Sequence, residues 1–228
     1  MRRLASRCDT RAGVIDVLTG APRFLREEEV DRDSVDAAFR LLGENFSLTI
    51  VDLGSDLPDS ANPNPHSLTP AQALTGHTAG RVDHLIAVIA ANPSGVIRFA
   101  RAHDDLRTQM DHESVSYILN GVDYSRRALG DEAVLREALW RFADLREYTM
   151  VPFDDEKARR ASLSAVPLTD LGENQPILTA LRPVVDELEA RIPRNIRRRP
   201  HSETPVTASK LPLISEWVEK VKKLAPLR

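Results

Sequence analysis

The chain has 228 residues, of which 42% are hydrophobic and 29% are charged. This composition argues against a disordered polymer or a fibrous repeat and favours one main domain with an appendage. The net charge of −3 is unevenly distributed, because residues 191–228 hold ten basic and three acidic residues and so carry +7, which leaves −10 for residues 1–190. A basic tail on an acidic body predicts different partners for the two parts.

Cysteine content and hydropathy indicate the compartment. Cys8 is the only cysteine, so we expect neither an intrachain disulfide nor a cysteine-based zinc site. The longest apolar run covers residues 85–91. Its length is far below the roughly 20 residues that a transmembrane helix needs. The first residues lack the apolar core of a secretory signal. These features predict a cytoplasmic protein.

Short aliphatic runs alternate with longer amphipathic segments, which is typical of an α/β fold with a mostly parallel sheet flanked by helices. In chain order the sequence predicts a strand at 14–18, a helix at 35–46, a strand at 48–53, a short helix from 67 towards 76, a strand at 85–91, a helix at 96–110, a strand at 116–119, a helix at 131–147, a strand at 148–151 and a helix at 176–192.

Three local features refine these elements. The strand at 85–91 is apolar on both faces, which predicts a place inside the sheet. Ser94 is a candidate N-cap for the helix that follows. Pro183 is expected to bend or shorten the last helix, since proline removes a backbone hydrogen bond.

The composition changes after Pro193 and suggests three parts. We expect an α/β domain at 1–192, a flexible basic linker at 193–210 that contains an arginine triplet at 197–199, and a short amphipathic basic helix at 211–228. Arginine-rich linkers are usually solvated, and contact of the triplet with nucleic acid is the less supported alternative.

The predicted tail helix has an apolar face opposite a basic one. Its apolar face holds Ile214, Trp217, Val218 and Val221, and its basic residues are Lys220, Lys222 and Lys223. Such a helix suits an anionic membrane interface and would make the protein peripheral at the inner face of the membrane. Packing on the body of the protein, or on a protein partner, is an equally open interpretation, because a helix of this length is marginal when isolated.

The segment at 48–54 has the form of a hydrophobic strand that delivers Asp52 to its carboxyl end, just before Gly54. Ligands bind at that edge in open α/β sheets. In nucleotide hydrolases an aspartate at this place holds water on Mg²⁺. The alternative is an ordinary aspartate that caps the turn after a strand, and this alternative carries more weight when the motif is taken alone.

Several segments, taken in order, resemble the carboxyl-terminal two thirds of the MinD/ParA family of deviant Walker-type P-loop ATPases. The matching segments are GVIDVL at 13–18, IVDLG at 50–54, AANP at 90–93 with the helix after it, YILNGV at 117–122, MVPFD at 150–154 and the run 167–192. The resemblance implies a P-loop NTPase-like fold, incomplete at its amino-terminal end. It also implies that Asp52 would hold Mg²⁺ through water, that Gly54 belongs to the switch loop, that Asn120 reads adenine and that Pro152 and Phe153 border the base.

The phosphate-binding half of that family has no counterpart in this sequence. A P-loop needs closely spaced glycines and a lysine, whereas the first lysine here is Lys157 and no glycine is followed by lysine. Positioning and charge neutralisation provide most of phosphoryl-transfer catalysis. We therefore expect no independent ATP hydrolysis and no cofactor for this chain, with ATP and Mg²⁺ expected only if the missing half is provided.

The preferred interpretation is a truncated or degenerate MinD/ParA-like protein that acts in spatial positioning, partitioning or secretion-type assembly through protein contacts. Loss of a central strand would expose sheet edges, which invites a protein partner or a homodimer. The alternative is a genuine ATPase whose Walker A half lies upstream of Met1. A response-regulator-like or Rossmann-like binding domain is a third possibility, although no G-x-G-x-x-G follows the first strand. The histidines are too irregularly spaced for a zinc helix and are expected to be solvated or hydrogen-bonded.

Overall fold

The computed structural model describes residues 5–11, 13–18, 32–54, 70–109, 114–125, 131–172 and 175–191. They form two compact units. The first, the hairpin unit, holds the described residues up to Gly54 together with 70–78, and the second, the sheet unit, holds those of 79–191. Within these ranges no helix is long and apolar enough to cross a bilayer. The predicted linker and tail helix, with Ile214, Trp217, Val218, Val221, Lys220, Lys222 and Lys223, lie outside the described residues.

The hairpin unit contains two strands and two helices. Strands β1 (Ser6–Thr10) and β2 (Gly13–Val17) pair antiparallel, and they are followed by α1 (Arg32–Asn45) and α2 (Pro70–Ala79). His77 of α2 hydrogen-bonds Asp36 of α1 through Nε2 and Oδ1, 2.9 Å apart. The strand predicted near 14–18 is present, but it forms a hairpin and no parallel pair, because only two residues separate it from β1 and parallel strands need a long crossover.

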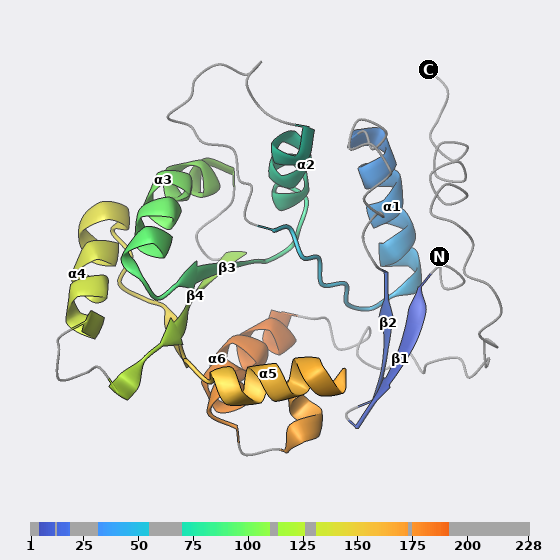
Figure 1. The fold of residues 1–228 in the computed structure, drawn as a ribbon. Helices are drawn as coiled ribbons and strands as arrows, with labels where there is room; N and C mark the ends of the chain where they lie inside the picture. Colours follow the sequence, from blue (N-terminus) through green and yellow to red (C-terminus); the bar gives the residue numbers. More distant parts are fainter. Residues whose placement is uncertain are drawn as a thin grey trace. The chain divides into compact units, whose positions relative to one another are not determined.

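The sheet unit has three parallel strands in the order β3-β4-β5. They are β3 (Leu85–Ala90), β4 (Val115–Val122) and β5 (Thr149–Pro152). Helices α3 (Pro93–Gln109) and α4 (Asp131–Ala143) form the crossovers, and α5 (Asp155–Ser164), a 3₁₀ helix at Leu168–Leu171 and α6 (Pro176–Arg191) follow (Figure 1). The predicted α/β class with a parallel sheet flanked by helices is thus confirmed.

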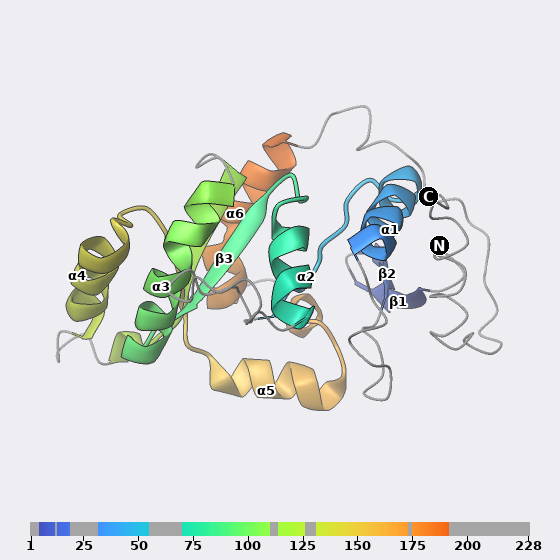
Figure 2. The ribbon, with the colours of Figure 1, turned by 90° about the horizontal axis from the view of Figure 1, so that it is seen from above.

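Helices cover both faces of the sheet. Tyr117 and Leu119 of β4 point to the α3 and α4 face, while Ile118 between them points to α6, as the period of two along a strand requires. The larger core cluster joins Ile89, Val96, Phe99, Tyr117, Leu119, Val122, Leu135, Leu139, Ala143 and Leu145. The smaller cluster joins Ile118, Val151 and Val184, with α6 on the opposite side of the sheet from α3 (Figure 2).

Two predicted strands differ from the structure. Residues 48–53 form no strand, and Ile50 is 84% exposed. A β-prone run becomes a strand only when a neighbour offers backbone partners, and no described strand pairs with this one. The strand at 85–91, predicted inside the sheet, is β3 at one edge of the described sheet. Its side chains alternate between the core, with Ile89 buried, and an open face, with Val88 63% exposed.

Proline affects α6 less than the sequence predicts. Pro183 lies inside the helix, which nevertheless runs without interruption from Pro176 to Arg191, so the predicted shortening does not occur. The neighbouring Val184 is buried against Ile118 and Val151. The free energy gained when this apolar side packs against the sheet offsets the loss of the hydrogen bond that the proline removes.

Candidate functional site

The carboxyl ends of β3, β4 and β5 meet at one edge of the sheet, where ligands bind in open α/β folds. We call this region the carboxyl edge and define it by the residues at the strand ends: Ala91 to Gly95, Asn120 to Val122 and Pro152 to Asp154. Three of the residues singled out by the sequence, Asn120, Pro152 and Phe153, belong to it.

The first loop of the carboxyl edge starts helix α3. The Oδ1 atom of Asn92 accepts a hydrogen bond from the backbone N–H of Gly95 at 2.8 Å, and Pro93 occupies the first helical position. Asparagine is a preferred N-cap, and proline is preferred directly after the cap. The prediction that Ser94 caps this helix is therefore wrong: Asn92 does so, two residues earlier, because Pro93 already has the backbone angle of a helix.

Gly95 allows the start of α3 to lie against the end of β3. A Cβ atom at this position would come within 2.4 Å of the Ala90 carbonyl oxygen and 2.8 Å of the Ala90 Cβ atom. No other residue type fits without a shift of the backbone. The glycine thus fixes how closely the helix approaches the strand.

The second and third loops lie side by side. Asn120 pairs with Val151 in the sheet, and a bulge at Gly121 shifts the register before Val122 pairs with Pro152. Gly121 has a φ of +81°, which suits glycine, and a Cβ atom there would lie 3.8 Å from the Phe153 ring. The structure therefore brings Asn120 together with Pro152 and Phe153. Asn120 and Phe153 are both exposed, with Phe153 at 63%.

Asp52 and Gly54 belong to the hairpin unit, whereas Asn120, Pro152 and Phe153 belong to the sheet unit. The Oδ1 atom of Asp52 accepts a hydrogen bond from the Gly54 N–H at 3.1 Å, and Gly54 has a φ of +67°. This is an aspartate that stabilises a local turn through its own backbone, which is the alternative interpretation of the motif. Asp52 does not end a strand of the sheet.

The donors at the carboxyl edge do not fit a triphosphate. At the start of α3, Pro93 has no N–H to offer an anion, and the N–H of Gly95 is occupied by Asn92. Lys157 is the only lysine in the described ranges, and its Nζ atom lies 3.1 Å from Asp154 Oδ2. Asp154 also caps α5 by accepting from the Lys157 N–H at 3.1 Å. That hydrogen bond, aided by the ammonium group, lowers the pKa of Asp154.

A polar cluster that the sequence does not reveal lies at the opposite edge of the sheet. His84 Nε2 is 2.8 Å from Ser116 Oγ, and the Ser116 hydroxyl donates to Glu187 Oε2 of α6 at 3.1 Å. Since the hydroxyl has one proton, His84 must be the donor to Ser116. The Nδ1 atom of His84 is buried without a hydrogen-bond partner among the described residues. Burial, followed by the charge of Arg191, lowers the pKa of His84 against the opposing effect of Glu187.

This cluster does not have the order that nucleophilic catalysis requires. In a serine hydrolase the histidine lies between the serine and the carboxylate, whereas here Ser116 lies between His84 and Glu187. The cluster therefore ties α6 to the amino-terminal ends of β3 and β4. His103, 2% exposed, lies 3.4 Å from the Tyr117 hydroxyl. His77, His84 and His103 are hydrogen-bonded, as predicted for the histidines.

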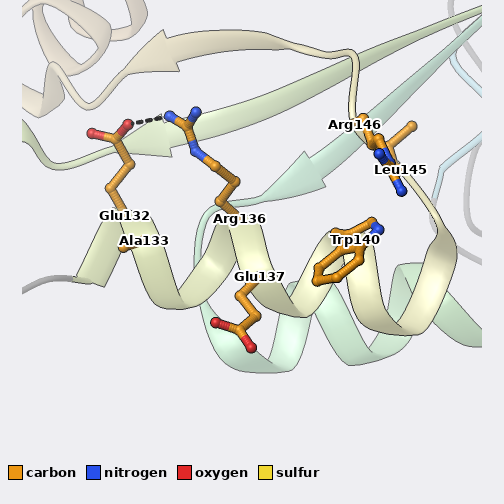
Figure 3. A pocket seen from close by; sticks show the side chains of 7 residues that line it. All are labelled: Glu132, Ala133, Arg136, Glu137, Trp140, Leu145 and Arg146. Carbon is orange, nitrogen blue, oxygen red and sulfur yellow. Dashed lines mark hydrogen bonds and ion pairs between the residues drawn. The ribbon is translucent and has the colours of Figure 1, made fainter.

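A shallow, open depression follows the outer side of α4 (Figure 3). Its lining pairs opposite charges: Glu132 and Arg136 are 2.7 Å apart, and the Arg146 guanidinium lies 5.4 Å from the centre of the Trp140 ring. Its two carboxylates, Glu132 and Glu137, are the only lining groups that could act as a base, and Glu132 is engaged by Arg136. In the part of the chain that the structure covers, no group of three or more His, Cys, Asp or Glu side chains could hold a metal ion.

No family model and no curated protein matches this chain. The resemblance to MinD/ParA ATPases therefore remains a prediction from the segments quoted above.

Proposed function

We propose that the protein is a degenerate MinD/ParA-like α/β protein that acts through protein contacts, in spatial positioning, partitioning or secretion-type assembly, and does not hydrolyse ATP by itself. One observation carries the proposal. The carboxyl edge holds Asn120, Pro152 and Phe153 together, as expected for a base-binding edge, while two donors near this edge, the Gly95 N–H and the Lys157 ammonium group, are engaged by Asn92 and Asp154.

The open edge of β3 supports a role in assembly. No described strand pairs with its outer side, and its open face exposes Val88 and, in part, Ile86. Unpaired strand edges offer backbone donors and acceptors to another chain. A sheet of three strands with such an edge fits an incomplete P-loop-like fold that a protein partner or a second copy completes.

The second candidate is a genuine ATPase of the same family whose Walker A half lies upstream of Met1. The same grouping of Asn120 with Phe153 favours it, because a base-binding edge serves a complete nucleotide site. In that case ATP and Mg²⁺ would be the cofactors. Asn120, Pro152 and Phe153 would hold the base, and Asp52 would act on Mg²⁺ through water.

Nucleotide binding distinguishes the two candidates. We would titrate the full chain, and the same chain extended by any in-frame upstream sequence, with a fluorescent ATP analogue and Mg²⁺. Asp52→Asn would test the metal role and Phe153→Ala the base edge, with the exposed Asp186→Asn as a matched control. We expect no saturable binding to the given chain.

Two outcomes would reject the degenerate-scaffold proposal. One is tight binding to the given chain that Asp52→Asn abolishes. The other is binding and hydrolysis that appear only in an extended chain carrying a K-G-G-x-G-K-[ST] sequence, which would establish the ATPase.

A separate sedimentation assay with anionic vesicles tests the predicted membrane contact of the tail. It compares the chain with and without residues 211–228 at two salt concentrations, because salt would weaken such a contact.

A further inference from the structure

Helix α4 presents an apolar stripe that the fold leaves uncovered. Its inner side buries Leu135 and Leu139. On the neighbouring side Val134 is 65% exposed and Phe142 is 63% exposed, with the half-buried Ala138 between them. Residues four apart lie above one another on a helix, so these three form one continuous line, which we call the α4 stripe.

The position of α4 leaves room for a partner along this line. Figure 1 and Figure 2 both show α4 at one end of the sheet unit, with α3 beside it and no other described element of that unit beyond it. The α3 and α4 helices pack against each other through the core. Within the described residues of the sheet unit, the outer side of α4 is therefore open to solvent.

One flank of the α4 stripe carries two opposite charges. Glu137 and Arg141 are one turn apart and exposed. Glu137 forms no ion pair with any described residue, and Figure 3 shows it leaving α4 in a different direction from Arg136, which pairs with Glu132. The Arg141 guanidinium lies 5.8 Å from the centre of the Phe142 ring. The charges are therefore set along the edge of the apolar line and available to a partner.

We propose that the partner is a second copy of this chain, whose α4 packs antiparallel on the α4 stripe about a twofold axis near Ala138. In such a pair the same surface serves both subunits. Val134 then lies opposite Phe142 of the partner subunit. Both residues are four positions from Ala138, which is small enough to let the two helices approach closely.

The charges fit the same axis. In an antiparallel pair related by a twofold axis, the flank of one helix faces the same flank of the other, so Glu137 lies opposite Arg141 of the partner subunit and the reverse contact repeats it. Glu137 and Arg141 are centred on position 139, and Val134 and Phe142 are centred on position 138. Both pairs therefore fit nearly the same twofold axis. One acidic and one basic residue give the stripe no net charge, which disfavours nucleic acid or an anionic membrane as its occupant.

The interface is small, because α4 has only 13 residues. It buries less than the roughly 1,200 Å² at which stable interfaces begin, so the dimer is weak and its population rises with protein concentration. Because the total binding free energy of a weak dimer is small, even the modest contribution of two symmetric surface ion pairs changes its Kd measurably.

Sedimentation velocity of the full chain over a range of concentrations tests the proposal. Glu137→Arg and Arg141→Glu each place like charges together and should raise the dimer Kd about tenfold. The double variant Glu137→Arg/Arg141→Glu restores opposite charges and should return the Kd to near the wild-type value. Arg159→Glu, an exposed charge reversal on α5, should leave it unchanged, and circular dichroism of each variant monitors folding.

Three results would overturn the proposal. The first is a monomer at every concentration. The second is a dimer whose Kd does not respond to either single charge reversal. The third is a double variant that dimerises no better than the single variants, since this would show that Glu137 and Arg141 do not face each other across the axis.

Discussion

His84 Nε2 lies 2.8 Å from Ser116 Oγ, and through this hydroxyl the imidazole reaches Glu187 of α6. Ser116 is 8% exposed, so the contact is largely shielded from water. His84 directly precedes β3, Ser116 lies at the start of β4 and Glu187 lies in the last turns of α6. A side-chain network of this kind fixes the helix against the sheet at the edge opposite the candidate site.

Removal of the central hydroxyl should destabilise the fold. Ser116→Ala leaves His84 Nε2 without its partner in a partly buried place, and we expect the free energy of unfolding to fall by about 1–3 kcal/mol. Urea unfolding followed by circular dichroism measures the change. Ser162→Ala on the exposed side of α5 is the control, and an equal loss in both variants would contradict the role of the network.

The same network should make the fold sensitive to acid. The pKa of His84 is below its ordinary value of 6.5 in the folded state. As the pH falls, His84 therefore takes up a proton in the unfolded chain before it does so in the folded protein. The stability that the neutral His84 provides is thus fully present above pH 6.5 and decreases as the pH falls below 6.5. The pKa of Glu187 is also lowered, first by its hydrogen bond from Arg191, and its contribution is lost at more acidic pH. Urea midpoints between pH 7.5 and 5 test this. In His84→Gln the decrease just below pH 6.5 should be smaller, and an unchanged decrease would reject the assignment.

Two glycines in helices should respond to alanine in opposite directions. Gly95→Ala places a Cβ atom 2.4 Å from the Ala90 carbonyl oxygen, and we expect a loss of about 1–3 kcal/mol, typical of overpacking. Gly43→Ala in α1 meets nothing within 4 Å and should be neutral or stabilising by up to about 1 kcal/mol. Thermal or urea unfolding measures both, and a harmless Gly95→Ala would contradict the close approach of α3 to β3.

The cap of α3 can be tested by two neighbouring substitutions. Asn92→Ala removes the acceptor of the Gly95 N–H and should cost about 1 kcal/mol, the typical value of an N-cap. Ser94→Ala should change stability by no more than a few tenths of a kcal/mol, because Ser94 is past the cap. Urea unfolding measures both changes, and a larger loss of stability in Ser94→Ala than in Asn92→Ala would contradict the assignment of Asn92 as the cap.

Core packing between α4 and the sheet should account for much of the stability of the sheet unit. Leu139 is fully buried, so Leu139→Ala should lower the free energy of unfolding by about 2–5 kcal/mol. Leu163 on α5 is 76% exposed, and Leu163→Ala removes the same atoms with little loss. Equal effects of the two substitutions in chemical unfolding would contradict the assigned core.

Periodicity predicted most elements of the sheet unit because their patterns agree with their surroundings. The strand at 116–119 and the helix at 131–147 correspond to β4 and α4, shifted by a few residues at their ends. The sequence could not show that the run at 48–53 lacks a partner strand, because pairing depends on residues far along the chain. The prediction that β3 lies inside the sheet was wrong for the same reason, because an apolar strand can also lie at the edge of a sheet with one face open to solvent.

The candidate site was predictable only in part. Asn120, Pro152 and Phe153 follow strands, and parallel strands end at one edge, so their grouping follows from local pattern and topology. The network of His84, Ser116 and Glu187 joins residues up to 103 positions apart, and no local pattern marks such a contact. Asn92 was missed as a cap because a serine two residues later offered the same chemistry.

We expect the exposed run at 48–53 to affect the behaviour of the protein at high concentration. Leu48-Thr49-Ile50-Val51-Asp52-Leu53 combines β-branched and aliphatic residues with a single charge and no proline, the composition of segments that stack into cross-β fibrils. In a strand that is paired within a sheet such a segment is protected, whereas here Ile50 is open to solvent. Besides stabilising its turn, Asp52 gives this segment its single charge, and we expect repulsion between stacked carboxylates to oppose such stacking.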